Sequence, residues 1–273
     1  MLPMLDIWRP QTWRNAVGHV LRSILPAKSF PELRRTPADE MFSDTLAYLI
    51  PSIPRCFDKD EFVEQLSAQI LSFFKTIRGF HGCRPTRGME SYLTEGIIPL
   101  NRDLLVRSCM DLVGKQVDPR VVRKAVFEAD LNGRLGRVYF GTDIAGSLEN
   151  YGHYAIYGAE SLSCVDDTSW PVSLWELQKK IGISTVIECA VPLTALSKVC
   201  RHEITKMIVT MWFQYQSDRP RSEKPARDDC FFAESIVTPD CILGHFHPNR
   251  IPDPHQNMKE FQNASTWCSW CLQ

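Results

Sequence analysis

The chain has 273 residues and a formal net charge of -1, with 31 Lys and Arg residues against 32 Asp and Glu residues. This length fits one large domain or two small ones, and the 44% share of hydrophobic residues is enough for an ordinary globular core. The composition excludes disordered, collagen-like and coiled-coil classes. Because the net charge is near zero, any binding to nucleic acid must rest on a local patch.

No apolar run approaches the roughly 18–20 residues that a membrane helix needs. The first ten residues contain Asp6 and have neither a basic region nor a long apolar stretch, so we expect no signal peptide. We therefore expect a cytoplasmic protein with no membrane partner. The ten cysteines are scattered along the chain, which favours reduced, mostly buried thiols over a disulfide framework.

Residues 1–76 read as a helical N-terminal region. The segment Thr36-Pro37-Ala38-Asp39 has a capping residue followed by Pro, and Pro51 is expected to end that helix. A second helix is predicted from Asp58-x-x-Glu61, a capping-box pattern followed by apolar residues at helical spacing.

Three further helices are predicted before residue 130. One ends near Gly96, one runs from Asn101 to Gly114, and one begins at Asp118-Pro119. From residue 137 the sequence becomes strand-like, rich in β-branched and aromatic residues, and the last residues, 249–273, read as an irregular tail. The predicted class is α+β, with strands expected at residues 137–142, 183–193, 204–216 and 231–237.

Three short segments carry residues that chemistry uses. The first is His81-Gly82-Cys83, followed by a helix and then Gly96-Ile97. The second is Tyr139-Phe140-Gly141, followed by Ser147 and Tyr151, and the third is Glu234 at the head of an apolar run. Taken alone, each has a plain structural explanation: a histidine beside a turn, a tyrosine in a packed strand, and a glutamate at a solvated edge.

In this order the segments resemble the ADP-ribosyltransferase superfamily, in its His-Tyr-Glu clade of diphtheria toxin and the poly(ADP-ribose) polymerases. The resemblance covers residues 78–245. It implies split antiparallel β-sheets with flanking helices in a catalytic domain at 77–248, with residues 249–273 packed on it as a tail. The chain departs from the family pattern at Cys83, where Thr or Ser is usual, at Gly141, where Ala is usual, and in a longer interval between Ser147 and Tyr151.

The resemblance implies NAD+ as a substrate, and no Gly-x-Gly-x-x-Gly loop supports a redox dinucleotide site. It assigns catalysis to Glu234, His81 and Tyr139, with Glu234 stabilising an oxocarbenium-like ribosyl cation. The residues that would bind NAD+ are His81, Gly82, Tyr139, Ser147 and Tyr151, with Tyr154 as the rival of Tyr151 for the second stacking position. We expect His81, Tyr139 and Glu234 to line one cleft.

The position two residues before the catalytic glutamate often reads the acceptor in this superfamily. Phe232 there argues against arginine modification and favours a nucleobase, on which an aromatic ring can stack. The preceding loop contributes Arg219 and Arg221 as further acceptor-recognition residues. The expected function is a mono-ADP-ribosyltransferase acting on a nucleic acid, RNA among them, or on a protein, as the toxin of a toxin–antitoxin or phage-defence system with a neutralising antitoxin.

Two other functions use the same residues. An NAD+ glycohydrolase would transfer ADP-ribose to water, and a catalytically silent member would bind ADP-ribose or a partner. The sequence also contains Cys268-x-x-Cys271, with His245, His247 and His255 upstream. These residue types are zinc ligands, but their spacing matches no standard zinc signature, so the sequence leads us to expect no metal.

Overall fold

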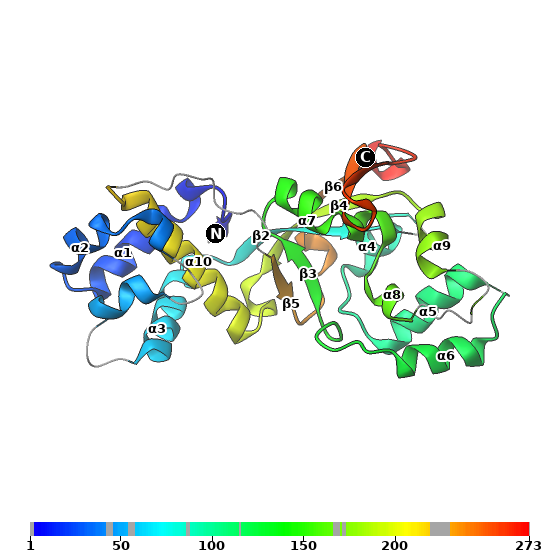
Figure 1. Cartoon of the computed structure of the whole chain (residues 1–273), viewed down its shortest axis with the longest axis horizontal. Helices are drawn as coiled ribbons and strands as arrows, with labels where there is room; N and C mark the ends of the chain where they lie inside the picture. Colours follow the sequence, from blue (N-terminus) through cyan, green and yellow to red (C-terminus); the bar gives the residue numbers. More distant parts are fainter. Residues whose placement is uncertain are drawn as a thin grey trace. The chain divides into compact units, whose positions relative to one another are not determined.

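The computed structural model describes residues 3–41, 46–53, 58–85, 88–114, 116–165, 170, 173–218 and 230–272. The chain forms two compact units (Figure 1). The first comprises Met1–Arg78 and Pro192–Ala226, and the second Gly79–Val191 and Arg227–Gln273. The first unit therefore takes in 192–226, which the sequence had assigned to the domain at 77–248.

The first unit is built of helices. Helix α10 packs against α1, α2 and α3. The indole of Trp212 in α10 donates a hydrogen bond to the carbonyl of Arg14 (3.0 Å), and Phe213 packs its ring against Phe30 and Tyr48. The described elements of this unit are β1 (Met4–Leu5), α1 (Arg14–Ile24), α2 (Ser29–Arg35), α3 (Lys59–Leu71), α10 (Lys198–Gln216) and 3-10 turns at Pro10–Thr12, Ala38–Glu40, Ala47–Ser52 and Leu193–Ala195.

The strand predicted at 204–216 is wrong, because this segment lies within α10. Ser197 caps the helix by accepting a hydrogen bond from the backbone N–H of Cys200 (3.1 Å). Ile204, Ile208 and Phe213 are among nine residues of α10 that are buried, and they lie on more than one side of it. A helix that is apolar on several sides is buried, and burial overrides the strand preference of β-branched residues.

The predicted helix between Thr36 and Pro51 is also wrong for the described residues. Ala38–Glu40 and Ala47–Ser52 are short 3-10 turns, and Pro51 lies inside the second of them. Leu46 has a φ of 46°, a left-handed conformation that interrupts a right-handed helix. Residues 42–45 lie outside the described part of the chain.

The second unit is centred on a mixed sheet with strand order β5-β3-β2-β4-β6. Strand β3 pairs with β5, β2 with β3, and β4 with β6, all antiparallel, and the register places Tyr139 opposite Phe232 and Phe80 opposite Gly141. Within the first unit, β1 adds a parallel pairing to the start of β2. The strands are β2 (Thr76–Cys83), β3 (Val138–Gly141), β4 (Thr185–Pro192), β5 (Cys230–Ala233), β6 (Ile242–Phe246), and a separate hairpin of β7 (Arg250–Asp253) and β8 (Lys259–Gln262).

The α+β class is therefore confirmed, although this architecture is not specific to ADP-ribosyltransferases. The helices predicted before residue 130 are present: Asn101 caps α5 by accepting from the Leu104 N–H (2.8 Å), and Asp118 caps α6. The strand-like reading after residue 137 missed α7, α8 and α9, and the tail read as irregular contains the β7–β8 hairpin. The helices are α4 (Glu90–Glu95), α5 (Arg102–Val113), α6 (Pro119–Glu128), α7 (Ile144–Tyr157), α8 (Ser161–Val165) and α9 (Leu174–Lys180).

Helices α5, α6, α8 and α9 share one apolar core, which includes Leu105, Val122, Leu162 and Leu174. Helix α7 packs on β7, where Ile251 is fully buried. Among the described helices of both units, none combines the length and apolarity needed to span a bilayer.

The start of α3 offers a test of local sequence signals. Asp58 accepts from the Glu61 N–H (2.8 Å) and Glu61 accepts from the Asp58 N–H (3.3 Å), a complete capping box. We expect Asp58→Ala to lower the free energy of unfolding by about 1 kcal/mol, since it leaves helix N–H groups without an acceptor. Urea unfolding checks this. The control Asp60→Ala removes a first-turn charge without a capping bond, and an equal loss from both variants would contradict the capping explanation.

Candidate functional site

The second unit contains a cavity of about 920 Å³, at the upper end of the range of small-molecule and cofactor sites. Strands β2 and β3 and helix α7 form much of its wall. The lining includes every residue that the resemblance assigns to NAD+ binding: His81, Gly82, Tyr139, Ser147 and Tyr151. Residues far apart in the sequence are thus brought to one concave surface.

His81 presents an acceptor nitrogen. Its Nδ1 lies 3.0 Å from the Tyr139 carbonyl oxygen, which can only accept, so Nδ1 carries the proton and Nε2 has the free lone pair. Burial lowers the pKa of His81 below its usual value, and the bond to Tyr139 offsets part of this effect. His81 is therefore a neutral imidazole at pH 7, able to accept a hydrogen bond from a hydroxyl group.

Gly82 lies where α7 approaches β2. A Cβ at this position would lie 3.3 Å from Tyr154 Cβ and 3.6 Å from the Ala155 nitrogen. Both contacts come from α7, so the missing side chain permits close helix–strand packing. Its expected contact with nicotinamide stays a prediction.

Ser147 offers an unsatisfied polar group at the cavity. Its Oγ is buried and has no hydrogen-bond partner among the described residues. A Cβ at Gly141 would overlap this oxygen, so the packing of Ser147 against β3 favours glycine at this position. A buried hydroxyl without a partner costs free energy, and a polar ligand group in the cavity would satisfy it.

Tyr151 and Tyr154 both line the cavity, because with Ser147 they follow the i, i+4, i+7 spacing of one face of α7. The Tyr154 hydroxyl donates to Glu160 (3.0 Å), and its pKa is raised, first by burial and then by this carboxylate. The Tyr154 ring is therefore anchored at its hydroxyl.

Tyr139 is half-buried, and its hydroxyl donates to the Gly133 carbonyl (2.5 Å). Its ring lies 5.7 Å from that of Phe232, and the Arg137 guanidinium lies over the Phe232 ring at 4.2 Å. Phe232 is not part of the cavity lining. A nucleobase that stacked on this face of Phe232 would have to displace Arg137.

Glu234 is exposed and directly follows β5, which ends at Ala233 and so is shorter than the strand predicted at 231–237. The residues on either side of Glu234 in the chain are paired. Ala233 pairs with Val138 of β3, and Val237 exchanges two backbone hydrogen bonds with Ile97 (2.8 and 3.0 Å). Val138 and Ile97 both line the cavity, whereas Glu234 does not. Of the three residues expected to line one cleft, the lining therefore contains His81 and Tyr139 only.

Gly96 makes the pairing of Ile97 with Val237 possible. Its φ of 80° favours glycine, and a Cβ there would overlap the Val237 carbonyl oxygen. The Gly-hydrophobic pair and the glutamate segment, which the sequence analysis singled out separately, are therefore neighbours in the fold.

The positive charge of the cavity was not predicted from the sequence. Five arginines line it, against three acidic residues. Arg84 donates four hydrogen bonds, to the carbonyls of Gln178, Lys179 and Ile181 and to Ser184 Oγ, and Arg134 pairs with Glu160 (2.9 Å). Arg107 and Arg123 are exposed and form no ion pair within the described residues. They lie on α5 and α6, and no motif in the sequence marks them.

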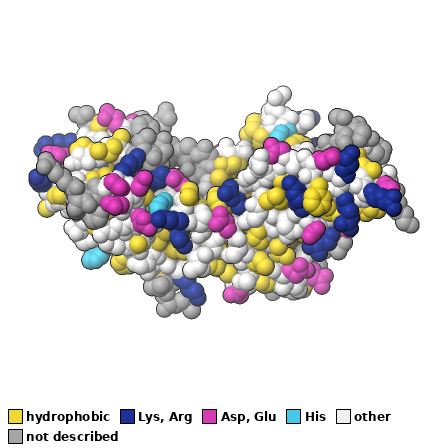
Figure 2. All heavy atoms as spheres, turned by 90° about the horizontal axis from the view of Figure 1, so that it is seen from below, with side chains coloured by type: hydrophobic (Ala, Val, Ile, Leu, Met, Phe, Trp, Pro, Cys, Tyr) yellow, Lys and Arg dark blue, Asp and Glu magenta, His cyan; other side chains and the backbone are white. Residues whose placement is uncertain are grey.

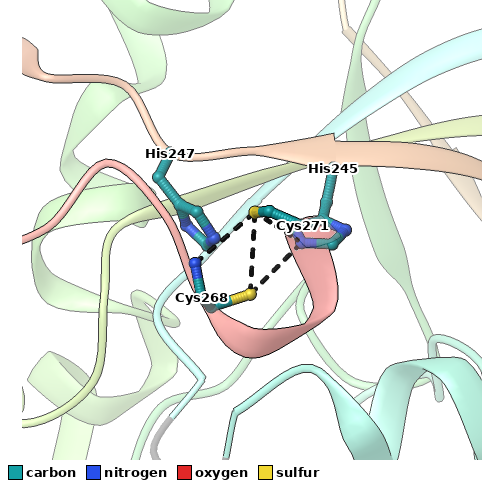
Figure 3. Close-up of side chains that lie close together, drawn as sticks. All are labelled: His245, His247, Cys268 and Cys271. Atoms are coloured by element: carbon teal, nitrogen blue, oxygen red, sulfur yellow. Dashed lines mark hydrogen bonds between the residues drawn. The ribbon is translucent and has the colours of Figure 1, made fainter. Parts of the chain in front are cut away.

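The acceptor-recognition arginines and the His and Cys residues of zinc-ligand type remain to be placed. Arg219 and Arg221 lie outside the described residues. The terminal Cys268 and Cys271 lie with His245 and His247, their ligand atoms within 4.8 Å of one another (Figure 3). His255 lies elsewhere, its ring 4.6 Å from that of Trp175.

Comparisons of the chain with protein-family models, with curated proteins and with solved structures found no match.

The contact between Gly141 and Ser147 is testable by a double-mutant cycle. We expect Gly141→Ala to lower the free energy of unfolding by about 1–3 kcal/mol, the usual cost of overpacking, because the new Cβ meets Ser147 Oγ. In a Ser147→Gly background the same substitution should cost clearly less. Urea unfolding of the four proteins gives the coupling energy, and a value near zero would contradict the close contact.

Proposed function

We propose that this protein is a mono-ADP-ribosyltransferase that uses NAD+ as the donor and a macromolecule as the acceptor. The observation that carries the proposal is that the three segments with His81, Tyr139 and Glu234 lie next to one another in the fold. Strand β2 carries His81, β3 carries Tyr139, and β5 ends one residue before Glu234. In the sheet, β3 lies between β2 and β5. The segment of Glu234 is paired on both sides with residues that line the cavity.

The polar groups of the cavity suit the parts of NAD+. His81 Nε2 would accept from a ribose hydroxyl, and Ser147 Oγ would bond the nicotinamide carboxamide. Tyr139 and one of Tyr151 and Tyr154 would enclose the nicotinamide ring. The guanidinium groups of Arg107 and Arg123, which form no ion pair with another described residue, suit the diphosphate, because arginine binds phosphate oxygens in a bidentate manner.

The reaction would exchange one bond at the ribose C1′ for another. The bond to nicotinamide breaks and its electron pair leaves with the base, while the acceptor attacks C1′ and loses a proton. Positive charge develops on the ribose between these events, as in glycoside hydrolysis. Glu234, accepting a hydrogen bond from a ribose hydroxyl, would stabilise this charge.

A basic surface supports a nucleic acid acceptor. Helix α6 carries Arg120, Arg123 and Lys124, with Val121 and Phe127 exposed beside them. Figure 2 shows Lys and Arg side chains gathered with apolar ones on the side of the molecule where α6 lies in Figure 1. Arg123 also lines the cavity, so a phosphate backbone bound here would pass beside the donor site. An acceptor essential to the cell would make the enzyme a toxin that needs an antitoxin.

The first test is release of nicotinamide from NAD+ by the purified protein. We expect Glu234→Gln to lower the rate by about 10²–10³, the usual effect of losing one group that stabilises transition-state charge. Glu260→Gln, an exposed glutamate on β8, is the matched control and should leave the rate unchanged.

Addition of protein, RNA and DNA fractions in separate reactions identifies the acceptor by the transfer of labelled ADP-ribose. Release that depends on Glu234 without any transfer would favour the glycohydrolase. Binding of ADP-ribose with no release under any condition would favour the silent module. Equal rates for wild type and Glu234→Gln would remove Glu234 from the mechanism.

The state of His81 gives NAD+ binding a defined pH dependence. Its pKa is lowered, so the imidazole is neutral throughout pH 7–8 and affinity should be constant there. Below the His81 pKa, which lies under about 6.5, a proton on Nε2 removes the acceptor, and Kd should rise by up to about tenfold per pH unit. Calorimetry against pH measures this. His81→Gln should bind more weakly with a flat profile, and a retained slope would assign the titration to another group.

A further inference from the structure

Besides the cavity residues, two histidines and two cysteines lie close together where the C-terminal turn meets the sheet. His245 lies in β6 and His247 follows that strand, whereas Cys268 precedes and Cys271 lies in the 3-10 turn Ser269–Leu272. Both cysteines are free thiols. Among the described residues this is the group of His, Cys, Asp and Glu side chains whose geometry suits a metal ion, and it is separate from the cavity, whose lining contains none of the four.

The distances within the group match those of a tetrahedral zinc site. The two Sγ atoms lie 3.8 Å apart, and His245 Nε2 lies 3.4 Å from each of them (Figure 3). Zn–S bonds of about 2.3 Å and Zn–N bonds of about 2.0–2.1 Å at tetrahedral angles require S···S near 3.8 Å and S···N near 3.6 Å. The side chains therefore surround a space of the size that zinc needs.

His247 supplies an independent indication. It is only 6% exposed, and its Nε2 is buried with no hydrogen-bond partner among the described residues. Its Nδ1 lies 3.2 Å from the Ser184 carbonyl and 3.0 Å from Thr185 Oγ1. The carbonyl requires a proton on Nδ1, which leaves a lone pair on Nε2 for the metal. Zinc-bound histidines are characteristically held in this way, by a carbonyl on the other ring nitrogen.

The C-terminal segment has little else to hold it in place. From Pro254 to Cys271 no described residue is buried, so burial of apolar side chains contributes little. Outside the β7–β8 hairpin, the Asn263 side chain makes the clearest attachment, donating to the carbonyls of Ser184 and Pro248 (3.0 and 3.1 Å). Short segments with so little core are commonly stabilised by a metal or a disulfide.

We propose that His245, His247, Cys268 and Cys271 bind one Zn2+ ion as a structural site. Two thiolates and two imidazoles are ligands that zinc prefers. Four protein ligands complete a tetrahedron and leave no open position, so the ion holds the chain and does not activate water. It fixes the C-terminal turn against β6, the last strand of the sheet. This inference is independent of the proposed transferase activity.

The test is metal content, measured by mass spectrometry on untagged, full-length protein purified without chelator. We expect about one zinc per chain, and less than about a tenth of that in Cys268→Ser/Cys271→Ser. Cys230→Ser, an exposed cysteine outside the group, and His202→Ala are matched controls and should keep their zinc. His245→Cys preserves a ligand and should retain the metal, whereas His245→Ala should weaken its binding.

Cobalt provides a second readout that does not depend on a folded variant. Co2+ added to metal-free wild-type protein should give thiolate charge-transfer bands and the intense visible bands of a tetrahedral S2N2 site, and Zn2+ should displace it. Wild-type protein with neither zinc nor these cobalt bands would overturn the proposal. So would zinc retained by the double variant, or a Cys268–Cys271 disulfide in protein kept under reducing conditions.

Discussion

Helix α7 lies close to the sheet on one side and to the β7–β8 hairpin on the other, and the structure of the second unit depends on this packing. Glycine makes each approach possible. A Cβ at Gly82 would crowd Tyr154, one at Gly141 would overlap Ser147, and one at Gly152 would lie 2.7 Å from Ile251. Because protein interiors are close-packed, a single added carbon at such a point forces the neighbouring side chains or backbone to shift.

This packing explains how polar side chains from separate elements meet at one cavity of the second unit. The face of α7 that carries Ser147, Tyr151 and Tyr154 is held against β2 and β3, which present His81 and Tyr139. The charges around the cavity are of two kinds. Arg84 and Arg134 are held by carbonyl groups and by Glu160, whereas Arg107 and Arg123 are exposed. The first two stabilise the walls, and the second two form no ion pair with another described residue.

The side of α7 that faces away from the cavity packs against the β7–β8 hairpin near the C-terminus. Ile251 of β7 packs against this helix, and the Tyr157 hydroxyl donates to Asp253 (2.5 Å) at the end of the same strand. The hairpin leads to the turn that carries Cys268 and Cys271, which lies against β6 at the edge of the sheet. A metal ion at this point would thus support the element that backs α7.

The sequence by itself determined the features that depend on neighbouring residues. The starts of α3, α5 and α6 were predicted because Asp58, Asn101 and Asp118 cap their own helices, and the motif segments that reach the cavity could be named because each is only a few residues long. Tertiary structure decided the rest. Burial on several sides made α10 a helix despite its strand-like composition, and the fold leaves Glu234 after the end of β5 and outside the cavity lining. The sequence did not show that five arginines meet at the cavity, or that His245 and His247 meet the Cys268-x-x-Cys271 pair. Segments distant in sequence come together only when the sheet and its helices pack.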